Sequence, residues 1–165
     1  MTLHARVWRA GTHEAGEVTR LLLAFRDWFG GERPDERDAL HSVGLLLEDP
    51  ATEFLLAAVD EQAGAHGVCQ LRFRHSLWMS ADDCWLEDLF VEEQARRRGV
   101  GQALVEAACV RASERGATRI ELDTNETNAA AIALYERCGF SAASKSHDRA
   151  GGRDLLMGRR LERLS

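Results

Sequence analysis

The 165-residue sequence lacks the features that would mark a membrane or secreted protein. No apolar run approaches the ~18 residues that a membrane-spanning helix requires, which excludes such a span. The N-terminal stretch, "MTLHARVWRA", lacks the apolar segment of a signal peptide. We therefore expect a cytoplasmic protein with no membrane partner.

The sequence has few cysteines, and no two of them are close enough to form a Cys-x-x-Cys motif. Cys69, Cys84, Cys109 and Cys138 form no Cys-x-x-Cys motif. This excludes the usual zinc and redox motifs, so we expect no metal site and mostly buried free thiols. Cys138 shares a predicted helix with Tyr135, but the sequence places no histidine or other base with it. A nucleophilic cysteine is therefore not favoured.

The sequence has fewer basic than acidic residues: 21 basic residues against 27 acidic ones give a formal net charge of −6. This deficit of positive charge argues against a general nucleic-acid binder and suits a cationic small substrate. The length fits one domain, residues 1–165. With 45% hydrophobic residues, that domain can bury a sizeable core.

Hydrophobic periodicity predicts the order of helices and strands. Helices are predicted over residues 14–29, about 40–47, 101–115 and 128–138, and strands over residues 5–10, 53–59, 68–75, 84–91, 117–124, 140–144 and 153–161. Three meandering strands followed by alternating helices and strands imply an α/β fold. We expect a mixed sheet of about seven strands with four helices.

Three finer expectations follow from the same patterns. Trp28 continues the apolar stripe of the first helix and is expected in the core. The third helix should bury a stripe that includes Leu104 and Val110. The segment "SLWMSADD", residues 76–83, is predicted to be a loop.

The stretch "ARRRGVGQAL", residues 95–104, combines three arginines with a Gly-x-Gly pair at the start of a predicted helix. A helix N-terminus presents unpaired N–H groups and partial positive charge, and glycine lets a ligand approach the backbone closely. This is a suitable place for a phosphate. The arginines and the bare amides would then share one pyrophosphate, although a solvated basic turn that starts a helix is also consistent with the sequence.

Two common phosphate motifs do not fit this loop. A dinucleotide-binding fingerprint needs a third glycine where this chain has Leu104, and a P-loop needs Gly-Lys-Ser/Thr where Gly101 is followed by Gln102. One arginine triplet without interleaved aromatic residues is also a weak nucleic-acid signal.

A second group of residues lies downstream, in "NETNAAAIALYERCGF", residues 125–140. Asn128 stands at a helix start, where it is a good N-cap. Tyr135 lies two turns later on the apolar face, so it is either a core residue or an acid. It is the only tyrosine, and a phenol with a pKa near ~10 stays protonated at neutral pH. Tyr135 could therefore protonate a departing thiolate.

Together these segments resemble the GNAT family of N-acetyltransferases over essentially the whole chain. The resemblance rests on Arg96-x-x-Gly99-x-Gly101 after a strand, then Asn128, Tyr135 and the Gly139-Phe140 turn. A narrower likeness, carried by "WLEDLFV" at residues 85–91, is to diamine and spermidine acetyltransferases. The first helix lacks a clear equivalent of the substrate-binding segment of those enzymes.

The resemblance implies acetyl-CoA as cosubstrate and assigns a role to each matching residue. The backbone of Leu89, Phe90 and Val91 would bind the pantetheine arm, and Asn128 would hydrogen-bond it. Tyr135 would protonate the leaving thiolate. The pyrophosphate of coenzyme A would be bound by a continuous segment that consists of Arg97, Arg98, Gly99, Val100, Gly101 and Gln102. Arg96 occupies the family's usual Arg/Gln motif position in the cofactor site.

The expected reaction is direct attack of an amine on the thioester. An amine of pKa near ~10.4 arrives charged, so a base must take its proton. Glu87, on the strand beside the expected thioester site, is the candidate base, directly or through a water. Its alternative is an ion pair with Arg72 or Arg74. Asp88 should point to the opposite face of a regular strand.

The expected acceptor pocket lies between the first two helices and the loop before "CWLED". Its candidate residues are Arg26, Asp27, Trp28, Trp78 and Glu87, of which Asp27, Trp78 and Glu87 are expected to bind the substrate. We expect a small-molecule amine, polyamine-like by preference. A protein N-terminus or lysine, or a non-catalytic acyl-CoA-binding regulator, are the alternatives, and the presence of Tyr135 and Glu87 counts against the regulator. By analogy with relatives, we expect a homodimer.

Overall fold

A computed structural model describes residues 4–149 and 152–162. The strands are β1 (Arg6–Arg9), β2 (Thr52–Ala58), β3 (Gly67–Ser76), β4 (Ala81–Val91), β5 (Ala117–Asn125), β6 (Ser141–Arg149) and β7 (Gly152–Arg160). The α-helices are α1 (Ala15–Trp28), α2 (Glu36–Glu48), α3 (Val100–Glu114) and α4 (Ala129–Arg137). Two short 3₁₀ helices, η1 (Thr12–Glu14) and η2 (Glu93–Ala95), complete the elements of the described ranges.

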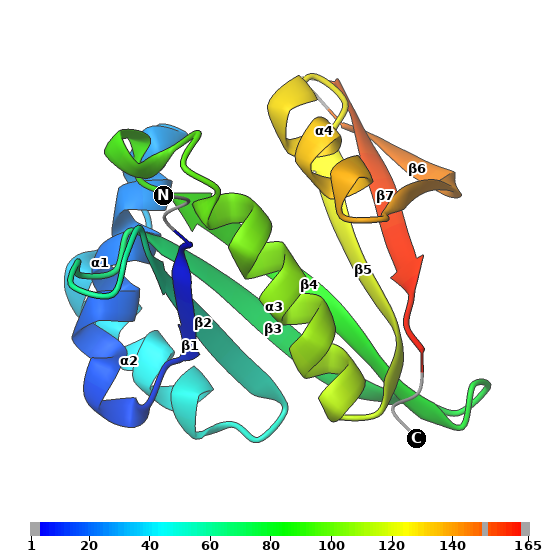
Figure 1. The fold of residues 1–165 in the computed structure, drawn as a ribbon, viewed down its shortest axis with the longest axis horizontal. Coiled ribbons are helices and arrows are strands. Elements are labelled where there is room, and N and C mark those ends of the chain that lie inside the picture. Colours follow the sequence, from blue (N-terminus) through cyan, green and yellow to red (C-terminus); the bar gives the residue numbers. More distant parts are fainter. Residues whose placement is uncertain (1–3, 150–151, 163–165) are drawn as a thin grey trace. The chain divides into compact units, whose positions relative to one another are not determined.

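The seven strands form one sheet in the order β1-β2-β3-β4-β5-β7-β6 (Figure 1). The sheet is mixed, because β4 and β5 are parallel whereas β1 and β2, β5 and β7, and β6 and β7 are antiparallel. The predicted α/β class, with seven strands and four α-helices, is confirmed. Several boundaries were wrong: residues 81–83 belong to β4 rather than to a loop, β6 extends to Arg149 rather than to residue 144, and α2 begins at Glu36 rather than near residue 40.

The chain divides into two compact units. The first comprises Met1–Leu71 and Asp88–Leu104, and the second comprises Arg72–Glu87 and Val105–Ser165. Strands β3 and β4 and helix α3 each contribute residues to both units. That residues 1–165 act as one domain stays a prediction.

The core of the first unit is formed by α1 and α2, which lie side by side in Figure 1, together with the strands that they cover. Its buried members include Val18, Leu21, Val43, Phe54, Leu56 and Phe90. Helix α2 begins where the Asp35 carboxylate accepts a hydrogen bond from the Asp38 N–H at 2.9 Å. Asp35 is therefore the N-cap of α2. The helix ends before Asp49-Pro50, as predicted.

In the second unit, the predicted buried stripe of α3 was partly wrong. Val110 is 57% exposed, whereas Val105, Ala108, Cys109 and Ala112 are buried. Apolar residues surround much of this helix, so the spacing alone does not decide which face packs inward. Among the described residues no helix combines the length and the apolar character needed to cross a bilayer.

Candidate active site

The loop between η2 and α3 has the backbone of an anion site. Arg97 and Gly99 both have positive φ, at 59° and 80°. The first bond of the helix that follows runs from the Ala103 N–H to the Gly99 carbonyl at 3.0 Å, so the amides of Val100 and Gly101 precede the helical ladder. Amides turned outward at a positively polarised helix start bind anions.

The three arginines of this loop differ in what they contact, although all are exposed. Arg96 Nε donates to the Val91 carbonyl at 3.0 Å, and its guanidinium lies 5.1 Å from the ring centroid of Trp28. Arg96 therefore connects the loop to β4 and α1. Arg98 lies near Asp60, whose pKa is lowered by hydrogen bonds from the Gln62 and Ala63 amides and also by the charge of Arg98.

The expectation that Trp28 is a core residue was wrong. Its side chain is 57% exposed, and one of its contacts is the guanidinium of Arg96. Trp28 lies at the last position of α1, where the helix has already passed the buried part of its stripe. An aromatic ring under an arginine contributes about 0.5–1 kcal/mol at an exposed site, so Trp28 helps to hold the base of the loop.

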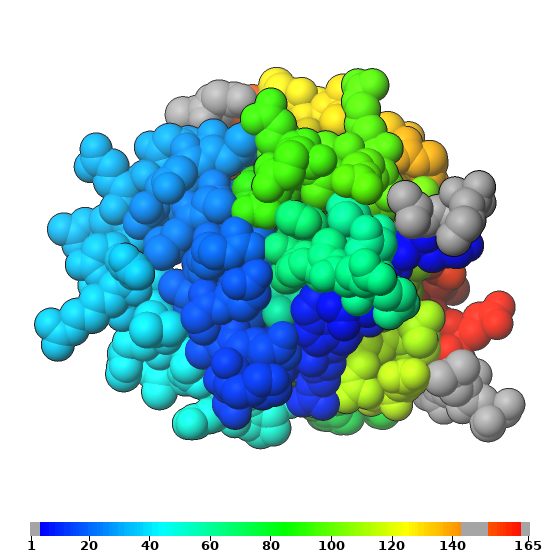
Figure 2. Space-filling model, turned by 60° about the vertical axis from the view of Figure 1, so that its left-hand side comes forward, coloured from blue at the N-terminus to red at the C-terminus, as the bar shows by residue number. Residues whose placement is uncertain are grey.

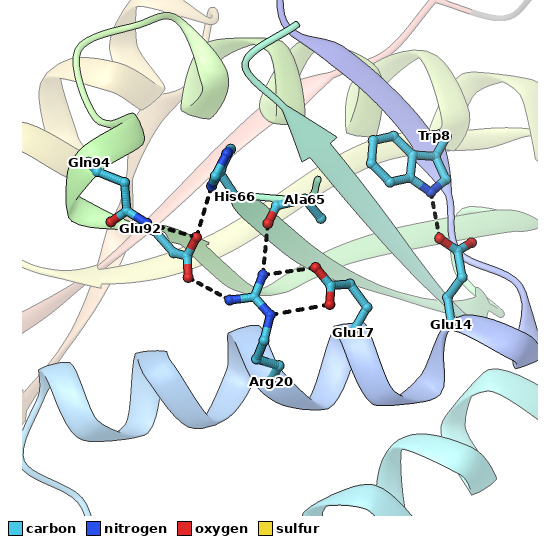
Figure 3. Close-up of polar contacts among 8 residues, drawn as sticks. All are labelled: Trp8, Glu14, Glu17, Arg20, Ala65, His66, Glu92 and Gln94. Atoms are coloured by element: carbon cyan, nitrogen blue, oxygen red, sulfur yellow. Dashed lines mark hydrogen bonds and ion pairs between the residues drawn. The ribbon is translucent and has the colours of Figure 1, made fainter. Parts of the chain in front are cut away.

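A polar network fixes the segment that leads into the loop (Figure 3). Arg20, on α1, donates to Glu92 at 2.6 Å, to Glu17 at 2.8 Å and to the Ala65 carbonyl at 2.8 Å. The second oxygen of Glu92 lies 3.0 Å from Nδ1 of His66. In Figure 2, α1 (blue), the segment directly before β3 and the segment directly after β4 (both green) lie next to one another on one face of the first unit.

The network shifts the ionisation of both charged partners. Burial alone would favour neutral Glu92, but hydrogen bonds from His66 and Arg20 hold its pKa below the ordinary value. The hydrogen bond between Arg20 and Glu17 raises the pKa of the Arg20 guanidinium. Both groups therefore stay ionised at neutral pH, and the charge pair persists where the chain enters residues 96–99, the arginine loop between η2 and α3.

The start of α3 sits close against β3 because residue 67 is a glycine. A Cβ at Gly67 would lie 2.9 Å from Cδ1 of Leu104 and 2.9 Å from Cγ1 of Val100, and both of these side chains are buried. Only a residue without a side chain permits this approach. Gly67 therefore helps to place the helix start that carries the loop amides.

Neighbouring residues of β4 point their side chains in different directions, as predicted. Glu87 is exposed and forms an ion pair with Arg72 at 3.6 Å, whereas Asp88 is half-buried and lines a pocket of the first unit. The register of β4 with β5 runs from Asp82 opposite Ala117 to Trp85 opposite Glu121, and β4 continues to Val91. The ion pair that the sequence allowed for Glu87 is thus present.

The pocket lies between α1 and α2 and has a volume of about 230 Å³. Most of its walls are apolar, with contributions from Leu22, Phe25, Phe29, Pro34, Val43 and Leu46. Arg26, Arg33 and Asp88 also line it. Arg26 was among the residues expected at the acceptor pocket, whereas Arg33 and Asp88 were missed. The three come from three separate segments, so local spacing carries no signal that they meet.

Two of the predicted substrate-binding residues lie elsewhere. Asp27 is exposed, pairs with Arg26 at 2.6 Å and borders a different hollow of about 360 Å³ beside α1. Trp78 is 91% exposed on the turn between β3 and β4. Neither side chain lines the pocket between α1 and α2, and their roles in substrate binding stay predictions.

Asn128 and Tyr135 belong to the second unit and lie at the two ends of α4, each of which is capped by hydrogen bonds. The side chain of Asn128 accepts from the Ala131 N–H at 3.2 Å, so Asn128 is the predicted N-cap. At the other end, Phe140 and Gly139 donate to the carbonyls of Tyr135 and Glu136, each at 3.0 Å. With Gly139 at φ 86°, these bonds form a Schellman motif.

The Schellman motif fixes Tyr135. The Tyr135 and Phe140 rings lie 5.9 Å apart, the apolar contact that accompanies such a cap, and Tyr135 is only 7% exposed. On the same helix face, burial raises the pKa of the Cys138 thiol, as it does for Cys109. These thiols therefore stay protonated, which agrees with the view that Cys138 is no nucleophile.

Residues 18–140, well over half of the chain, match the sequence model of the Acetyltransferase (GNAT) family. The chain belongs to this family. The resemblance stated from the sequence is confirmed at that level, and the matched range includes β4, the arginine loop, Asn128 and Tyr135.

Curated GNAT relatives differ in their acceptors. The [Ribosomal protein bS18]-alanine N-acetyltransferase of Escherichia coli K12 is 38% identical over 63 residues, which are 38% of this chain and 43% of that protein. An aminoglycoside N(6')-acetyltransferase type 1 of Klebsiella aerogenes is 33% identical over 96 residues, 58% of this chain and 63% of the relative. The chain thus spans less than half of the first relative, and neither name supports the narrower diamine and spermidine likeness.

Solved structures support the GNAT fold. A probable acetyltransferase superposes with a TM-score of 0.79 at 25% identity and covers 88% of this chain and 95% of its own. An acetyltransferase of the GNAT family from Streptococcus pneumoniae gives a TM-score of 0.74 at 15% identity, with coverage of 96% and 100%.

GNAT proteins use acetyl-CoA, and the arginine loop fits the pyrophosphate of that molecule. The αL residues Arg97 and Gly99 turn the chain into the helix start, and Arg97 and Arg98 add exposed positive charge. A pyrophosphate needs this combination of backbone donors and cations. The Arg96 side chain contacts the Val91 carbonyl and the Trp28 ring, and its role in cofactor binding stays a prediction.

Proposed function

We propose that this GNAT protein transfers the acetyl group of acetyl-CoA to a primary amine. The observation that carries the proposal is the arginine loop, where the first N–H groups of α3 precede its hydrogen-bond ladder next to exposed arginine side chains, in the matched family region. In this proposal the backbone of Leu89, Phe90 and Val91 binds the pantetheine arm, and Asn128 uses the side-chain amide nitrogen that its cap leaves unused.

The reaction balances without a covalent enzyme intermediate. Glu87 takes one proton from the ammonium, directly or through a water, and the neutral nitrogen then attacks the thioester carbonyl. A backbone N–H near Leu89 stabilises the developing oxyanion. The C–N bond forms, the C–S bond breaks, and Tyr135 donates its phenolic proton to the departing thiolate. The second proton of the attacking nitrogen leaves to solvent.

The acceptor that we propose is a small amine. The pocket between α1 and α2 supports this choice, because a hollow of about 230 Å³ suits a small molecule. The polyamine-like preference rests on the segment "WLEDLFV" alone. A peptide N-terminus is the second candidate, favoured by the 38% identity to the ribosomal-protein alanine acetyltransferase over 63 residues. A homodimer is part of the proposal by analogy only.

Thiol release from acetyl-CoA, measured against a panel of monoamines, diamines, amino acids, aminoglycosides and short peptides, tests the function. We expect release with one class of small amine.

Tyr135→Phe should lower turnover at least ~10-fold at an unchanged melting temperature if the phenol is the acid. Asn128→Ser keeps a capping oxygen but removes the amide donor, so it should weaken coenzyme binding and preserve the helix. Tight coenzyme binding without release would instead indicate the acyl-CoA-binding regulator.

A further inference from the structure

Three aromatic rings of the first unit form a continuous stack that ends beside the arginine loop. The ring centroids of Phe90 and Phe25 lie 5.3 Å apart, and those of Phe25 and Trp28 lie 6.3 Å apart, with interplanar angles of 24° and 26°. These separations are typical of stacked aromatic pairs. Phe90 is buried, Phe25 is half-buried and Trp28 is exposed. The stack therefore begins in the core and presents an aromatic face at the surface, at the last position of α1.

The guanidinium of Arg96 lies over this aromatic face. Its carbon atom, Cζ, is 5.1 Å from the ring centroid of Trp28 and 5.9 Å from that of Phe90, and both distances fall within the range of a cation–π contact. Nε of the same group donates to the Val91 carbonyl at 3.0 Å. One side chain thus joins the end of α1, the end of β4 and the residue that begins the arginine loop.

The backbone directly after Arg96 needs such an anchor. Arg97 has a φ of 59°, in the left-handed region that a residue with a Cβ adopts only at a cost in free energy. Such a conformation persists when the residues on both sides hold it. On one side, Val100 is buried at the start of α3. On the other side, η2 ends at Ala95, and the Arg96 side chain then holds the chain just before the turn.

The two segments that Arg96 joins have different proposed partners. The backbone at Val91 belongs to the proposed site of the pantetheine arm, whereas the loop amides and Arg98 belong to the proposed site of the pyrophosphate. Both groups are parts of one coenzyme molecule, so the two subsites must keep a fixed separation to bind it well. A side chain that only bound phosphate would act on one subsite, whereas a side chain that joins the two segments acts on both.

Resting on the proposed use of acetyl-CoA, we propose that Trp28 is a positioning residue of the coenzyme site and acts through Arg96. The ring of Trp28 holds the Arg96 guanidinium against the Val91 carbonyl. Arg96 thereby fixes the pyrophosphate loop relative to the strand end that receives the pantetheine arm. The last residue of α1 thus sets the geometry of the coenzyme site without itself contacting the coenzyme.

Limited digestion with trypsin tests the support of the loop in the free protein. The initial rate of cleavage after Arg97 and Arg98, read by mass spectrometry, should rise at least ~3-fold in Trp28→Ala. Trp28→Phe keeps an aromatic face and should stay within about 2-fold of the wild type. Leu45→Ala is the matched control, because it truncates an apolar side chain of α2 that is 58% exposed, and it should leave the rate unchanged. Equal rates in Trp28→Ala and the wild type would overturn the proposal.

Two ligands distinguish positioning from phosphate binding: coenzyme A, and pantetheine, which has the arm but no pyrophosphate. Calorimetry measures both affinities. Trp28→Ala and Arg96→Met should each raise the Kd of both ligands by similar factors of at least ~3-fold. Arg98→Met, the same change at the next arginine but one, should raise the Kd of coenzyme A alone. An effect of Arg96→Met that is confined to coenzyme A would overturn the proposal, because it would make Arg96 a phosphate ligand.

A double variant tests whether Trp28 acts through Arg96. Trp28→Ala combined with Arg96→Met should bind coenzyme A no more than about 2-fold more weakly than Arg96→Met alone, because the support has no effect once the supported group is gone. Multiplied effects of the two substitutions would show that Trp28 acts by another route.

The outcomes separate this inference from the proposed function, because thiol release is measured independently of binding. The expected changes in Kd without thiol release from acetyl-CoA would sustain the positioning role and refute the transfer reaction. Thiol release with a Kd that Trp28→Ala leaves unchanged would sustain the reaction and overturn the positioning role. A wild-type protein that bound neither ligand would also overturn it.

Discussion

Nη1 of Arg20 lies 2.6 Å from Oε1 of Glu92, so helix α1 is tied to the residue that directly follows β4. The same guanidinium also bonds Glu17 and the Ala65 carbonyl. Because the segment after Glu92 leads into the arginine loop, this one side chain links the fold of the first unit to the position of its anion site.

Replacing Arg20 with Met should lower the free energy of unfolding by about 1–2 kcal/mol, because Glu92 and the Ala65 carbonyl lose their donor. Urea denaturation measures the change. Arg37→Met removes an exposed arginine of α2 and should change the free energy by less than about 0.5 kcal/mol. Equal effects of the two substitutions would show that the Arg20 contacts contribute nothing specific.

The lowered pKa of Glu92 predicts a pH dependence of stability. A carboxyl whose pKa is depressed on folding contributes stability that is present above its ordinary pKa of about 4.3. This contribution is lost as the pH falls through the lower, folded-state pKa. In urea unfolding across that range, the wild type should lose more stability than Glu92→Gln. The exposed neighbour variant Glu93→Gln should follow the wild type, and parallel curves for all three would exclude the network as the cause.

Gly67→Ala should destabilise the protein by about 1–3 kcal/mol, because the new Cβ would lie 2.9 Å from the buried Val100 and Leu104 side chains. It should also raise the KM for acetyl-CoA, since the first turn of α3 must shift. Gly44→Ala, in the interior of α2 with nothing within 4 Å of the new Cβ, should stabilise by about 0.5–1 kcal/mol. Thermal and urea unfolding test the pair, and a neutral Gly67→Ala would refute the close approach.

Arg98→Ala should raise the KM for acetyl-CoA about 3–10-fold at low ionic strength, because one exposed cation of the pyrophosphate site is lost. The difference from wild type should shrink as salt is added, since exposed charges are screened. Steady-state kinetics at several salt concentrations measure it. Arg37→Ala serves as the control of equal charge, and a salt-independent change in KM would indicate a cause other than electrostatics.

The fold was largely readable from the sequence because its elements have strong periodicity and clear ends. Asn128 caps α4, and Gly139 ends it in the left-handed region. The cap at Asp35 was not recognised, so the start of α2 was placed too late. The errors fall where periodicity is ambiguous. Val110 lies on a helix that is apolar on several sides, and Trp28 lies at a helix end where the buried stripe has finished.

The candidate site was readable only where its residues are neighbours in sequence. The arginines, the glycines and the helix start of the loop form one continuous segment, so their joint chemistry could be predicted. The ion pair of Arg20 with Glu92 spans 72 residues, and the pocket joins Arg33 to Asp88. Such contacts depend on packing between distant segments and leave no local pattern in the sequence.

The most direct test of the account is a single reaction of the purified protein with acetyl-CoA and the most active amine of the panel, in which free thiol and the N-acetylated amine are both quantified. The account predicts that thiol and N-acetyl product appear in equal amounts, and that omission of the protein or the amine stops both. Thiol release without N-acetylated amine, or no release across the whole amine panel, would contradict it.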